Sequence, residues 1–366
     1  MTAAVAVSGS RTRAVRTISI VLAIALAAVL LFYSLRGIEW QRVWQLIEHA
    51  RPGWLAFALA LSTTTLFLRA CRWRVLLSAE ADVSVPDVFW ATCAGYFGNN
   101  FLPARGGELV RTYMISAGYR LDLPFVLATA LCERIADAVT LVAIASVVLL
   151  TLPAQSGAVA KAVPLFAAIA LAGAAAIVIL PLVGPAAVRL LQRVPLPDRL
   201  RSRLVAACDQ GLRGLRAFHH VGRLPGFCAF SAAIWILDAL ATTITAKALA
   251  LSIALPVAFL LLAALGLGSA LPSTPGYVGI YQFVAVTVLT PFGLSRTDAI
   301  AYILLAQALS YVVIGIWGSI GIARYRRTRR SASTTPATHS KSIDNPISDT
   351  CAPRTRPGSS YSNRTW

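Results

Sequence analysis

Charged residues are scarce in this chain, and lysine is the scarcest of them. Of the 366 residues, 13% are charged and 57% are hydrophobic, whereas charged residues make up roughly 25% of an ordinary soluble domain. Only three of the 33 basic residues are lysines. This composition excludes a typical soluble enzyme and indicates a protein embedded in a membrane.

Cysteine and histidine are also few. None of the six cysteines has the paired spacing of a metal site, and there are four histidines. The sequence shows no nucleotide-binding loop and no Ser/His/Asp arrangement that can be argued. We therefore expect no metal, no cofactor and no catalytic set, and we interpret the cysteines as small apolar residues within helices.

The net charge of +18 is concentrated in three segments. Residues 1–17, 184–224 and 324–366 together carry 16 of these 18 units. Each segment flanks apolar sequence, which is the positive-inside pattern of a multi-pass membrane protein. A nucleic-acid-binding protein more often carries its basic residues on one folded face, so no nucleic-acid partner is expected.

Six apolar stretches are long enough to cross the hydrocarbon core as helices, which takes about 20 residues. They are 17–35, 54–77, 124–152, 162–183, 227–250 and 299–322. The first stretch is longer than the apolar region of a typical signal peptide and lacks a small-residue cleavage site, so we interpret it as a signal anchor.

Two further apolar stretches are short and interrupted. Residues 86–101 and 255–271 end at Leu-Pro, and each is followed by Gly-containing sequence and a second short apolar segment, 107–119 or 277–291. Each interrupted element lies between two long spans, and the two units have opposite topology. This pattern is typical of inverted-repeat transporters with a site at the breaks. Alternatively, Pro and Gly are simply common in membrane helices.

The basic segments predict how the chain crosses the membrane. Three arginines before residue 17 place the N-terminus inside. If 86–101 crossed fully, the arginine-rich segment 184–224 would lie outside, whereas a re-entrant hairpin over 86–119 puts it inside, as the charge rule requires. The segment 324–366 then also lies inside. We therefore expect a plasma-membrane protein with both termini cytoplasmic.

The predicted fold class is an all-α polytopic membrane protein. It has about six full transmembrane helices and two Pro/Gly-broken, re-entrant elements, or about eight spans if the second element crosses fully. Its parts are a basic N-terminus (1–16), a transmembrane domain (17–323) and a basic disordered tail (324–366). Within the domain, 184–224 is expected to form a basic amphipathic connection that lies, with 324–330, on the anionic inner leaflet.

The first interruption contains polar residues that lipid disfavours. We predict that Pro103 and Gly106 break the helix and that a new helix begins at Gly107, with free N–H groups pointing into a cavity. These groups and two arginines would form an anion site suited to phosphate. The predicted substrate-binding residues here are Asn100, Arg105, Gly107, Glu108 and Arg111. Alternatively, Glu108 only complements the helix dipole and the arginines are interfacial.

A second polar cluster lies within 124–152. Glu133 and Asp137 are four residues apart and share a helix face, and Arg134 precedes Asp137 by three residues. We predict that these residues balance charge across a polar cavity or couple to protons. The alternative is a buried ion pair that only holds helices together. Three arginines near the end of 54–77 are instead expected to be interfacial anchors: Arg69, Arg72 and Arg74.

The second interruption carries hydroxyls and an amide in place of charges. Its predicted helix-breaking residues are Pro272, Pro275 and Gly279. A second half-helix is expected to start near Gly276, which together with Tyr277 and Gln282 would bind substrate. Asp238, the lone acid of 227–250, is a further candidate for balancing charge in the cavity.

Three motifs follow one another along the chain. They are Asn100-x-x-Pro103-x-Arg105-x-Gly107-Glu108-x-x-Arg111, Glu133-Arg134-x-x-Asp137 and Pro272-x-x-Pro275-Gly276-x-x-Gly279. Together they resemble the flippase-like, lysylphosphatidylglycerol synthase transmembrane-region family, over roughly residues 15–325. The resemblance implies relatives that flip aminoacylated phosphatidylglycerol or take part in polyprenyl-lipid glycosylation and hopanoid pathways.

Two departures from the family pattern shape the expected function. We expect no soluble aminoacyl-transferring domain after residue 325, so lipid aminoacylation is not predicted. Tyr277 replaces a Gly of many relatives, and Gln282 stands where they have Glu. The second motif therefore lacks the acidic group that the resemblance would imply.

The sequence thus predicts a flippase-like translocase for an anionic phospholipid or a polyprenyl-phosphate-linked headgroup. Two other classes stay open. One is a membrane enzyme that acts on a lipid phosphate, with Glu108 or Asp137 as base. The other is an accessory membrane protein whose basic segments bind a glycosyltransferase or lipid-synthesis partner.

Overall fold

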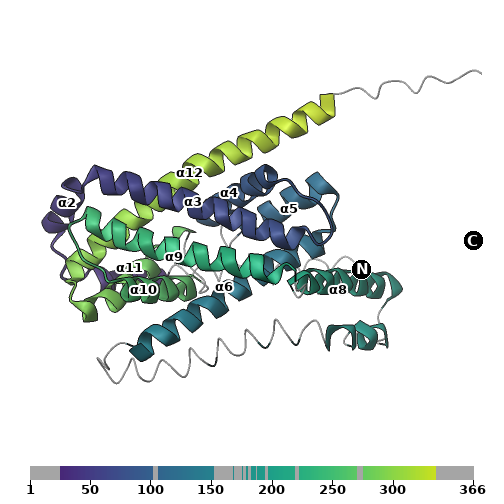
Figure 1. Cartoon of the computed structure of the whole chain (residues 1–366), viewed down its shortest axis with the longest axis horizontal. Coiled ribbons are helices and arrows are strands. Elements are labelled where there is room, and N and C mark those ends of the chain that lie inside the picture. Colours follow the sequence, from purple (N-terminus) through teal and green to yellow (C-terminus); the bar gives the residue numbers. More distant parts are fainter. Residues whose placement is uncertain are drawn as a thin grey trace, which may run out of the picture. The chain divides into compact units, whose positions relative to one another are not determined.

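The computed structural model describes residues 25–101, 106–151, 197–218, 222–269 and 275–334, together with scattered residues between 168 and 193. Every secondary-structure element in these ranges is a helix (Figure 1), which confirms the all-α prediction. The chain divides into a large unit, Met1–Arg326, and a small one, Arg327–Trp366. The candidate site residues belong to the large unit.

Within the described residues, three helices are long and apolar enough to cross a membrane. They are α3 (Pro52–Leu77), α9 (Leu224–Ala248) and the first 32 residues of α12 (Arg296–Thr334). Shorter apolar helices cover Ala25–Leu35, α10 (Leu255–Gly268) and the stretch Ile280–Phe292, which begins with α11 (Ile280–Leu289). Three of the six predicted spans are therefore helices of spanning length, while the number of crossings stays a prediction.

The first interrupted element has the predicted helix boundaries. α4 (Val85–Phe101) ends and α5 (Gly107–Tyr119) begins at the residues expected from the sequence, and α6 (Leu123–Thr151) follows. Pro103 and Arg105, within the predicted break, lie outside the described residues. The same holds for most of the predicted span 162–183 and for the tail after Thr334.

Two amphipathic helices lie between the apolar ones. α8 (Asp198–Phe218) falls within the predicted basic connection 184–224 and carries arginines among leucines, as expected. α2 (Trp40–Glu48) was not predicted, because its nine residues are too few for a membrane-crossing helix. Its Val43 is buried in an apolar cluster with residues of α9 to α12, while Trp40 and Trp44 are exposed.

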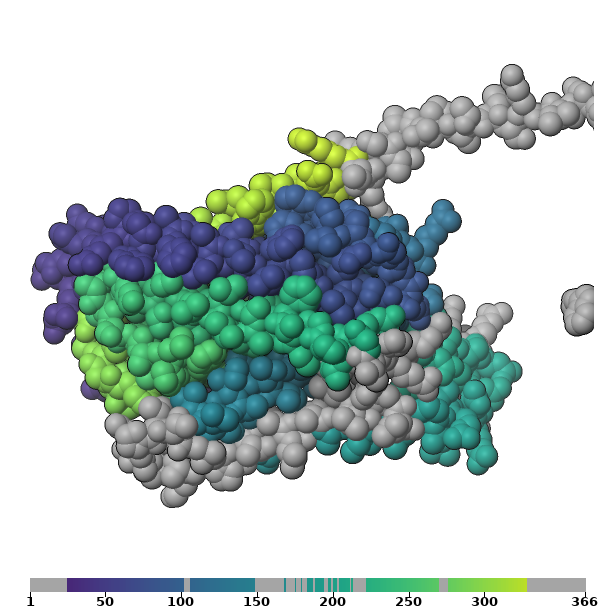
Figure 2. All heavy atoms as spheres, in the orientation of Figure 1, coloured from purple at the N-terminus to yellow at the C-terminus, as the bar shows by residue number. Residues whose placement is uncertain are grey.

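Helices α3 and α9 are antiparallel neighbours along their whole length. The backbone N–H of Arg51, before α3, donates to the carbonyl of Ala248, the last residue of α9, at 2.9 Å. At the other end, Arg223 donates to the carbonyl of Ser78 at 3.3 Å. Figure 2 shows purple α3 and green α9 side by side on one face of the molecule. Residues far apart in the sequence can therefore form ion pairs across this interface.

A glycine allows α4 and α5 to approach closely. A Cβ at Gly107 would collide with the carbonyl oxygen of Gly95 and lie 2.5 Å from the backbone nitrogen of Asn99. Any larger residue at this position would separate the two helices. Gly107 therefore sets the geometry of the first helix pair and brings the first turn of α5 beside the end of α4.

The second interrupted element differs from its prediction. A short 3₁₀ turn covers Pro275–Tyr277, and the following helix α11 begins at Ile280, not near Gly276. The reason is backbone conformation: Gly276, Tyr277 and Gly279 have φ angles of 73°, 62° and 90°, which a right-handed helix excludes. The break is therefore longer than the sequence indicated, and Tyr277 adopts a left-handed conformation that is unfavourable for a bulky residue.

Candidate functional site

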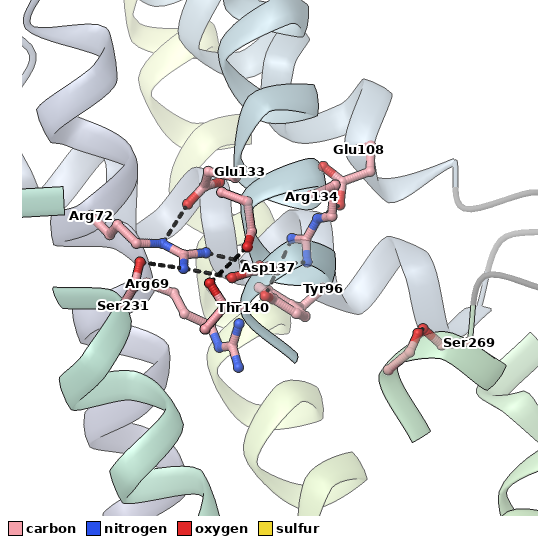
Figure 3. Close-up of polar contacts among 12 residues, drawn as sticks. Arg69, Arg72, Tyr96, Glu108, Glu133, Arg134, Asp137, Thr140, Ser231 and Ser269 are labelled. Carbon is pink, nitrogen blue, oxygen red and sulfur yellow. Dashed lines mark hydrogen bonds and ion pairs between the residues drawn. The ribbon is translucent and has the colours of Figure 1, made fainter. Parts of the chain in front are cut away.

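Arg72 lies at the centre of a buried ion-pair cluster (Figure 3). Its guanidinium donates to both oxygens of Asp137, Nη1 to Oδ1 at 2.6 Å and Nη2 to Oδ2 at 2.9 Å. Nε donates to Glu133 Oε1 at 3.2 Å, and Nη1 also donates to Ser231 Oγ at 3.1 Å. The side chain is 1% exposed. The prediction that Arg72 is an interfacial anchor is therefore wrong: two carboxylates of α6 neutralise it inside the bundle.

Arg111 extends this cluster to α5. Its Nε donates to Glu108 Oε2 at 2.6 Å and its Nη1 to Glu133 Oε2 at 3.0 Å. The guanidinium carbon lies 4.4 Å from the ring centroid of Trp73. Glu133 thus bridges Arg72 and Arg111 with one oxygen each. Nη2 of Arg111 has no hydrogen-bond partner among the described residues, but Arg111 is only 2% exposed and is therefore poorly placed to bind a ligand directly.

Arg134 and Glu108 form the more accessible part of the cluster. Their side chains are 30% and 21% exposed, and Arg134 Nε lies 3.0 Å from Glu108 Oε1. Arg134 Nη2 donates to the hydroxyl of Tyr96 at 3.3 Å. The predicted contact between Arg134 and Asp137 is present but longer, at 3.7 Å. Arg134 is therefore held less tightly than Arg72, and part of it remains free for another partner.

A separate ion pair joins α3 to α9. Arg69 Nη2 donates to Asp238 Oδ2 at 2.6 Å, and both side chains are partly exposed, at 16% and 18%. The Arg69 guanidinium also lies 5.4 Å from the ring centroid of Trp235 and 5.9 Å from that of Tyr96. The prediction that Arg69 is an interfacial anchor is therefore wrong. Arg69 is instead the ion-pair partner of Asp238. Arg74 does lie at the surface, where it pairs with exposed Asp82 at 2.8 Å.

These ion pairs balance one another. Four guanidinium groups meet four carboxylates: Arg69, Arg72, Arg111 and Arg134 with Glu108, Glu133, Asp137 and Asp238. The net charge of the set is therefore zero when every group is ionised. Such pairing is what a low-dielectric interior requires, since an unpaired charge costs several kcal/mol there.

A cavity of about 660 Å³ lies against this set. Both partly exposed ion pairs line it, together with Tyr96, Asn99, Asn100 and Asp137. The second break, α11 and α12 also line the cavity, with Gly276, Tyr277, Tyr281, Tyr302, Gln307 and Tyr311. The two interrupted elements, more than 150 residues apart in the sequence, therefore share one cavity.

The second break is held by amides and a hydroxyl. Gln282 Oε1 accepts from the backbone N–H of Gly279 at 2.7 Å, and Gln282 Nε2 donates to Gln307 Oε1 at 2.6 Å. Gln307 Nε2 and the Tyr311 hydroxyl both donate to the carbonyl of Gly276, at 3.0 and 2.8 Å. Because Gln282 is 3% exposed and does not line the cavity, it supports the cavity wall from behind.

The predicted site residues therefore fall into three groups. Those that line the cavity are Asn100, Glu108, Arg134, Asp137, Asp238, Gly276 and Tyr277. Those that lie behind its wall or shape the breaks are Gly106, Gly107, Arg111, Glu133, Pro275, Gly279 and Gln282. Those outside the described residues are Pro103, Arg105 and Pro272.

Sequence reasoning missed five residues of the site: Arg69, Arg72, Tyr96, Gln307 and Tyr311. The two arginines carried a usable signal. They are three residues apart and hence on the same face of an apolar helix, and that face is the one that meets α6 and α9. Gln307 was the one amide side chain in the apolar stretch 299–322, and the tyrosines gave no signal because their partners are remote in the sequence.

The partly exposed ion pairs determine what the site can do chemically. Arg134 presents guanidinium N–H groups to the cavity, and its carboxylate partner Glu108 is also bound by Arg111. An incoming anion can therefore replace Glu108 at Arg134 without leaving Glu108 unpaired. Guanidinium groups bind phosphate and carboxylate oxygens with strong, directional hydrogen bonds.

Comparison with known proteins agrees with this architecture. Residues 20–318 match the family model described as the lysylphosphatidylglycerol synthase TM region. A stretch of 152 residues is also 28% identical to a protein named glycosyltransferase AglD from Haloferax volcanii. That match covers 40% of this chain and 24% of the relative, so the chain spans only a small part of that protein. The family match extends over most of the sequence, and the chain belongs to the lysylphosphatidylglycerol synthase transmembrane-region family.

Proposed function

We propose that this protein is a multi-pass membrane lipid translocase, which binds a phosphate-bearing headgroup in the cavity between its two broken elements. The observation that carries this proposal is the pair of partly exposed ion pairs, Arg134–Glu108 and Arg69–Asp238, on the wall of a cavity of about 660 Å³. That volume is within the range of roughly 300–1,000 Å³ of ligand pockets. The substrate class is an anionic phospholipid or a polyprenyl-phosphate-linked lipid.

The phosphate binds by exchange of hydrogen-bond partners. Arg134 turns from Glu108 to a phosphate oxygen, while Arg111 keeps Glu108 neutralised. The free N–H groups in the first turn of α5 add a favourable dipole for an anion. Asn100 lines the same cavity, and its buried side-chain nitrogen has no hydrogen-bond partner among the described residues. It supplies a further donor for the headgroup.

Glu133 and Asp137 serve to balance charge. Both are bound to Arg72, and Glu133 also to Arg111. This arrangement keeps the arginines of the wall in place when a ligand displaces one carboxylate. Any coupling to protons would use Glu108 or Asp238, since these carboxylates are the partly exposed ones that line the cavity.

The broken helices and their arrangement also favour transport. Antiparallel packing of α3 on α9 is what an inverted repeat would require, because these helices begin the two predicted units. Transporters of that kind bind substrate near the bilayer midplane, where discontinuous helices meet. We further propose that both termini face the cytoplasm and that the basic segments lie on the inner leaflet of the plasma membrane.

Lipid flipping in proteoliposomes tests this function. The assay follows loss of fluorescence of labelled phosphatidylglycerol when a membrane-impermeant reductant is added. Arg134→Gln is expected to slow flipping about tenfold or more, because it removes a charge-assisted hydrogen bond to phosphate. Arg74→Gln, which changes a surface arginine, is the matched control and should flip at the wild-type rate. Wild-type flipping by a correctly inserted Arg134→Gln protein would overturn the site assignment.

A second candidate is an accessory role in lipid-linked glycan synthesis. It is favoured by the match to a protein named as a glycosyltransferase and by the basic amphipathic helix α8, whose arginines could bind a partner or an anionic surface. Deleting 184–224 and substituting Arg134 separate the two roles. If lipid-linked glycan synthesis in cells is lost on deletion of 184–224 but not on substitution of Arg134, the accessory role is favoured.

A further inference from the structure

We propose a second lipid-phosphate site, at the end of the helix bundle where α2 lies, formed by Arg36 and Arg296. A cavity of about 510 Å³ lies between the apolar helix Ala25–Leu35, α11 and the start of α12. Ser34, Thr287, Tyr33 and Phe283 line it beside the two arginines. This cavity is separate from the central one: α11 presents Tyr281 to the central cavity and Phe283 and Thr287 to this one.

The charge of this cavity differs from that of the central cavity. Among the described residues, neither Arg36 nor Arg296 forms an ion pair with a carboxylate. Arg296 Nη2 donates to the backbone carbonyl of Tyr33 at 2.6 Å, which fixes its position. The nearby acid Asp298 is bound by Arg42 at 3.0 Å. Two guanidinium groups therefore face one cavity with donors to spare, which favours an anion with several acceptor oxygens.

Exposed aromatic residues place this cavity at the level of lipid headgroups. α2 begins four residues after Arg36, and its Trp40 and Trp44, one helical turn apart, are 52% and 68% exposed. Trp and Tyr are enriched where a membrane meets water, because their rings are amphipathic. Tyr33, which lines the cavity, and the preceding Phe32 are exposed as well.

The occupant is a phospholipid whose headgroup carries net negative charge. Its phosphate lies between the two arginines, and the hydroxyl of Thr287 supplies a further hydrogen bond. The buried hydroxyl of Ser34 already donates to the carbonyl of Leu30 at 2.6 Å. Its acyl chains follow the exposed apolar side chains of Val29 and Phe32. A free phosphate ion would use the same donors but would gain nothing from this apolar surface. The site holds lipid whether or not the protein transports it, so it does not depend on the proposed translocation.

Lipid retention measured by native mass spectrometry tests the proposal. The full-length protein is equilibrated in nanodiscs of phosphatidylcholine with increasing phosphatidylglycerol, and the lipids that stay bound are counted. We expect preferential retention of phosphatidylglycerol. Arg36→Gln should weaken it several-fold, and the double change R36Q/R296Q about tenfold or more. Arg36→Lys with Arg296→Lys should retain most of the binding, because both positive charges remain.

Controls separate this site from the central cavity and from misfolding. Arg51→Gln changes another exposed arginine near this end of the bundle and should bind as the wild type does. Arg134→Gln should keep the part of the retention that R36Q/R296Q removes, even if it stops flipping and loses lipid from the central cavity. Arg36→Gln keeps the bond from Arg296 to Tyr33, so its unfolding temperature should equal that of the wild type. Weakened binding at an unchanged unfolding temperature is not a folding effect. Equal retention of both lipids, unchanged binding in R36Q/R296Q, or full displacement by millimolar inorganic phosphate would each overturn the proposal.

Discussion

The two broken elements face the same cavity but are built from different chemistry. The break between α4 and α5 lies against buried ion pairs in which Arg111 and Arg134 meet carboxylates. The break before α11 is held by Gln282, Gln307 and Tyr311, with no charged group in the network. Both breaks contain a Pro followed by Gly residues. Their polar groups are nevertheless satisfied differently, by ion pairs in the first element and by neutral hydrogen bonds in the second.

This difference assigns different tasks to the two elements. Ion pairs that are partly exposed can exchange partners, so the first element is suited to bind and release a charged headgroup. The amide network is buried and satisfies a carbonyl and an N–H that the break leaves without helical partners. It is suited to hold the opposite wall rigid. If the two units arose as repeats, their chemistry diverged while their helix breaks persisted.

The largest expected effect is on the charged element. Arg72→Gln removes the bidentate partner of Asp137 and one of the two arginines bound to Glu133. We expect the free energy of unfolding to fall by about 3–5 kcal/mol, because two buried carboxylates lose compensation. The measurement is chemical or thermal unfolding of the detergent-purified protein.

Arg74→Gln, two residues further along α3, is the matched control. Arg74 pairs with an exposed Asp82 and donates to one backbone carbonyl. Its loss should cost no more than about 1.5 kcal/mol. Equal destabilisation by both substitutions would mean that the buried cluster does not stabilise the bundle.

A smaller effect is expected at the second break. Gln282→Leu leaves the N–H of Gly279 and the side-chain oxygen of Gln307 without their partners. We expect a loss of about 1–3 kcal/mol, the cost of unsatisfied buried polar groups. Gln45→Leu on exposed α2 is the control and should change stability by about 0.5 kcal/mol or less. A cost at Gln282 as large as at Arg72 would contradict the contrast drawn between the two breaks.

The sequence predicted the helices better than the partners of their polar residues. The boundaries of α4 and α5 followed from the helix-breaking Pro and Gly residues and from the length of the apolar runs. The boundary of α11 did not, because the positive φ angles of Gly276, Tyr277 and Gly279 lie in a break that is held by tertiary contacts from α12. Helix periodicity reports which face of a helix is apolar and not which remote residue meets a polar side chain.

The arginines of α3 illustrate this limit. Arg69, Arg72 and Arg74 lie near the cytoplasmic end of the predicted span, where long basic side chains usually extend to the interface. Only the antiparallel packing of α9 and the proximity of α6 reveal that Arg69 and Arg72 face carboxylates and that Arg74 does not. Within α6, by contrast, the four-residue spacing of Glu133 and Asp137 correctly predicted that both face inward, because it is local.

The smallest expected effect isolates a single hydrogen bond of the second break. Tyr311→Phe removes the hydroxyl that donates to the carbonyl of Gly276 at 2.8 Å, while Gln307 still donates to the same oxygen. We expect a loss of about 0.5–1.5 kcal/mol, the usual net value of a neutral hydrogen bond. Tyr119→Phe removes an exposed hydroxyl that bonds to Asp87 beside the first helix pair, and there water can replace the lost contact. Unfolding should therefore show a larger loss for Tyr311→Phe than for Tyr119→Phe. The reverse order would indicate that the left-handed turn at Gly276 is maintained by the backbone alone and that the amide network does not hold the cavity wall.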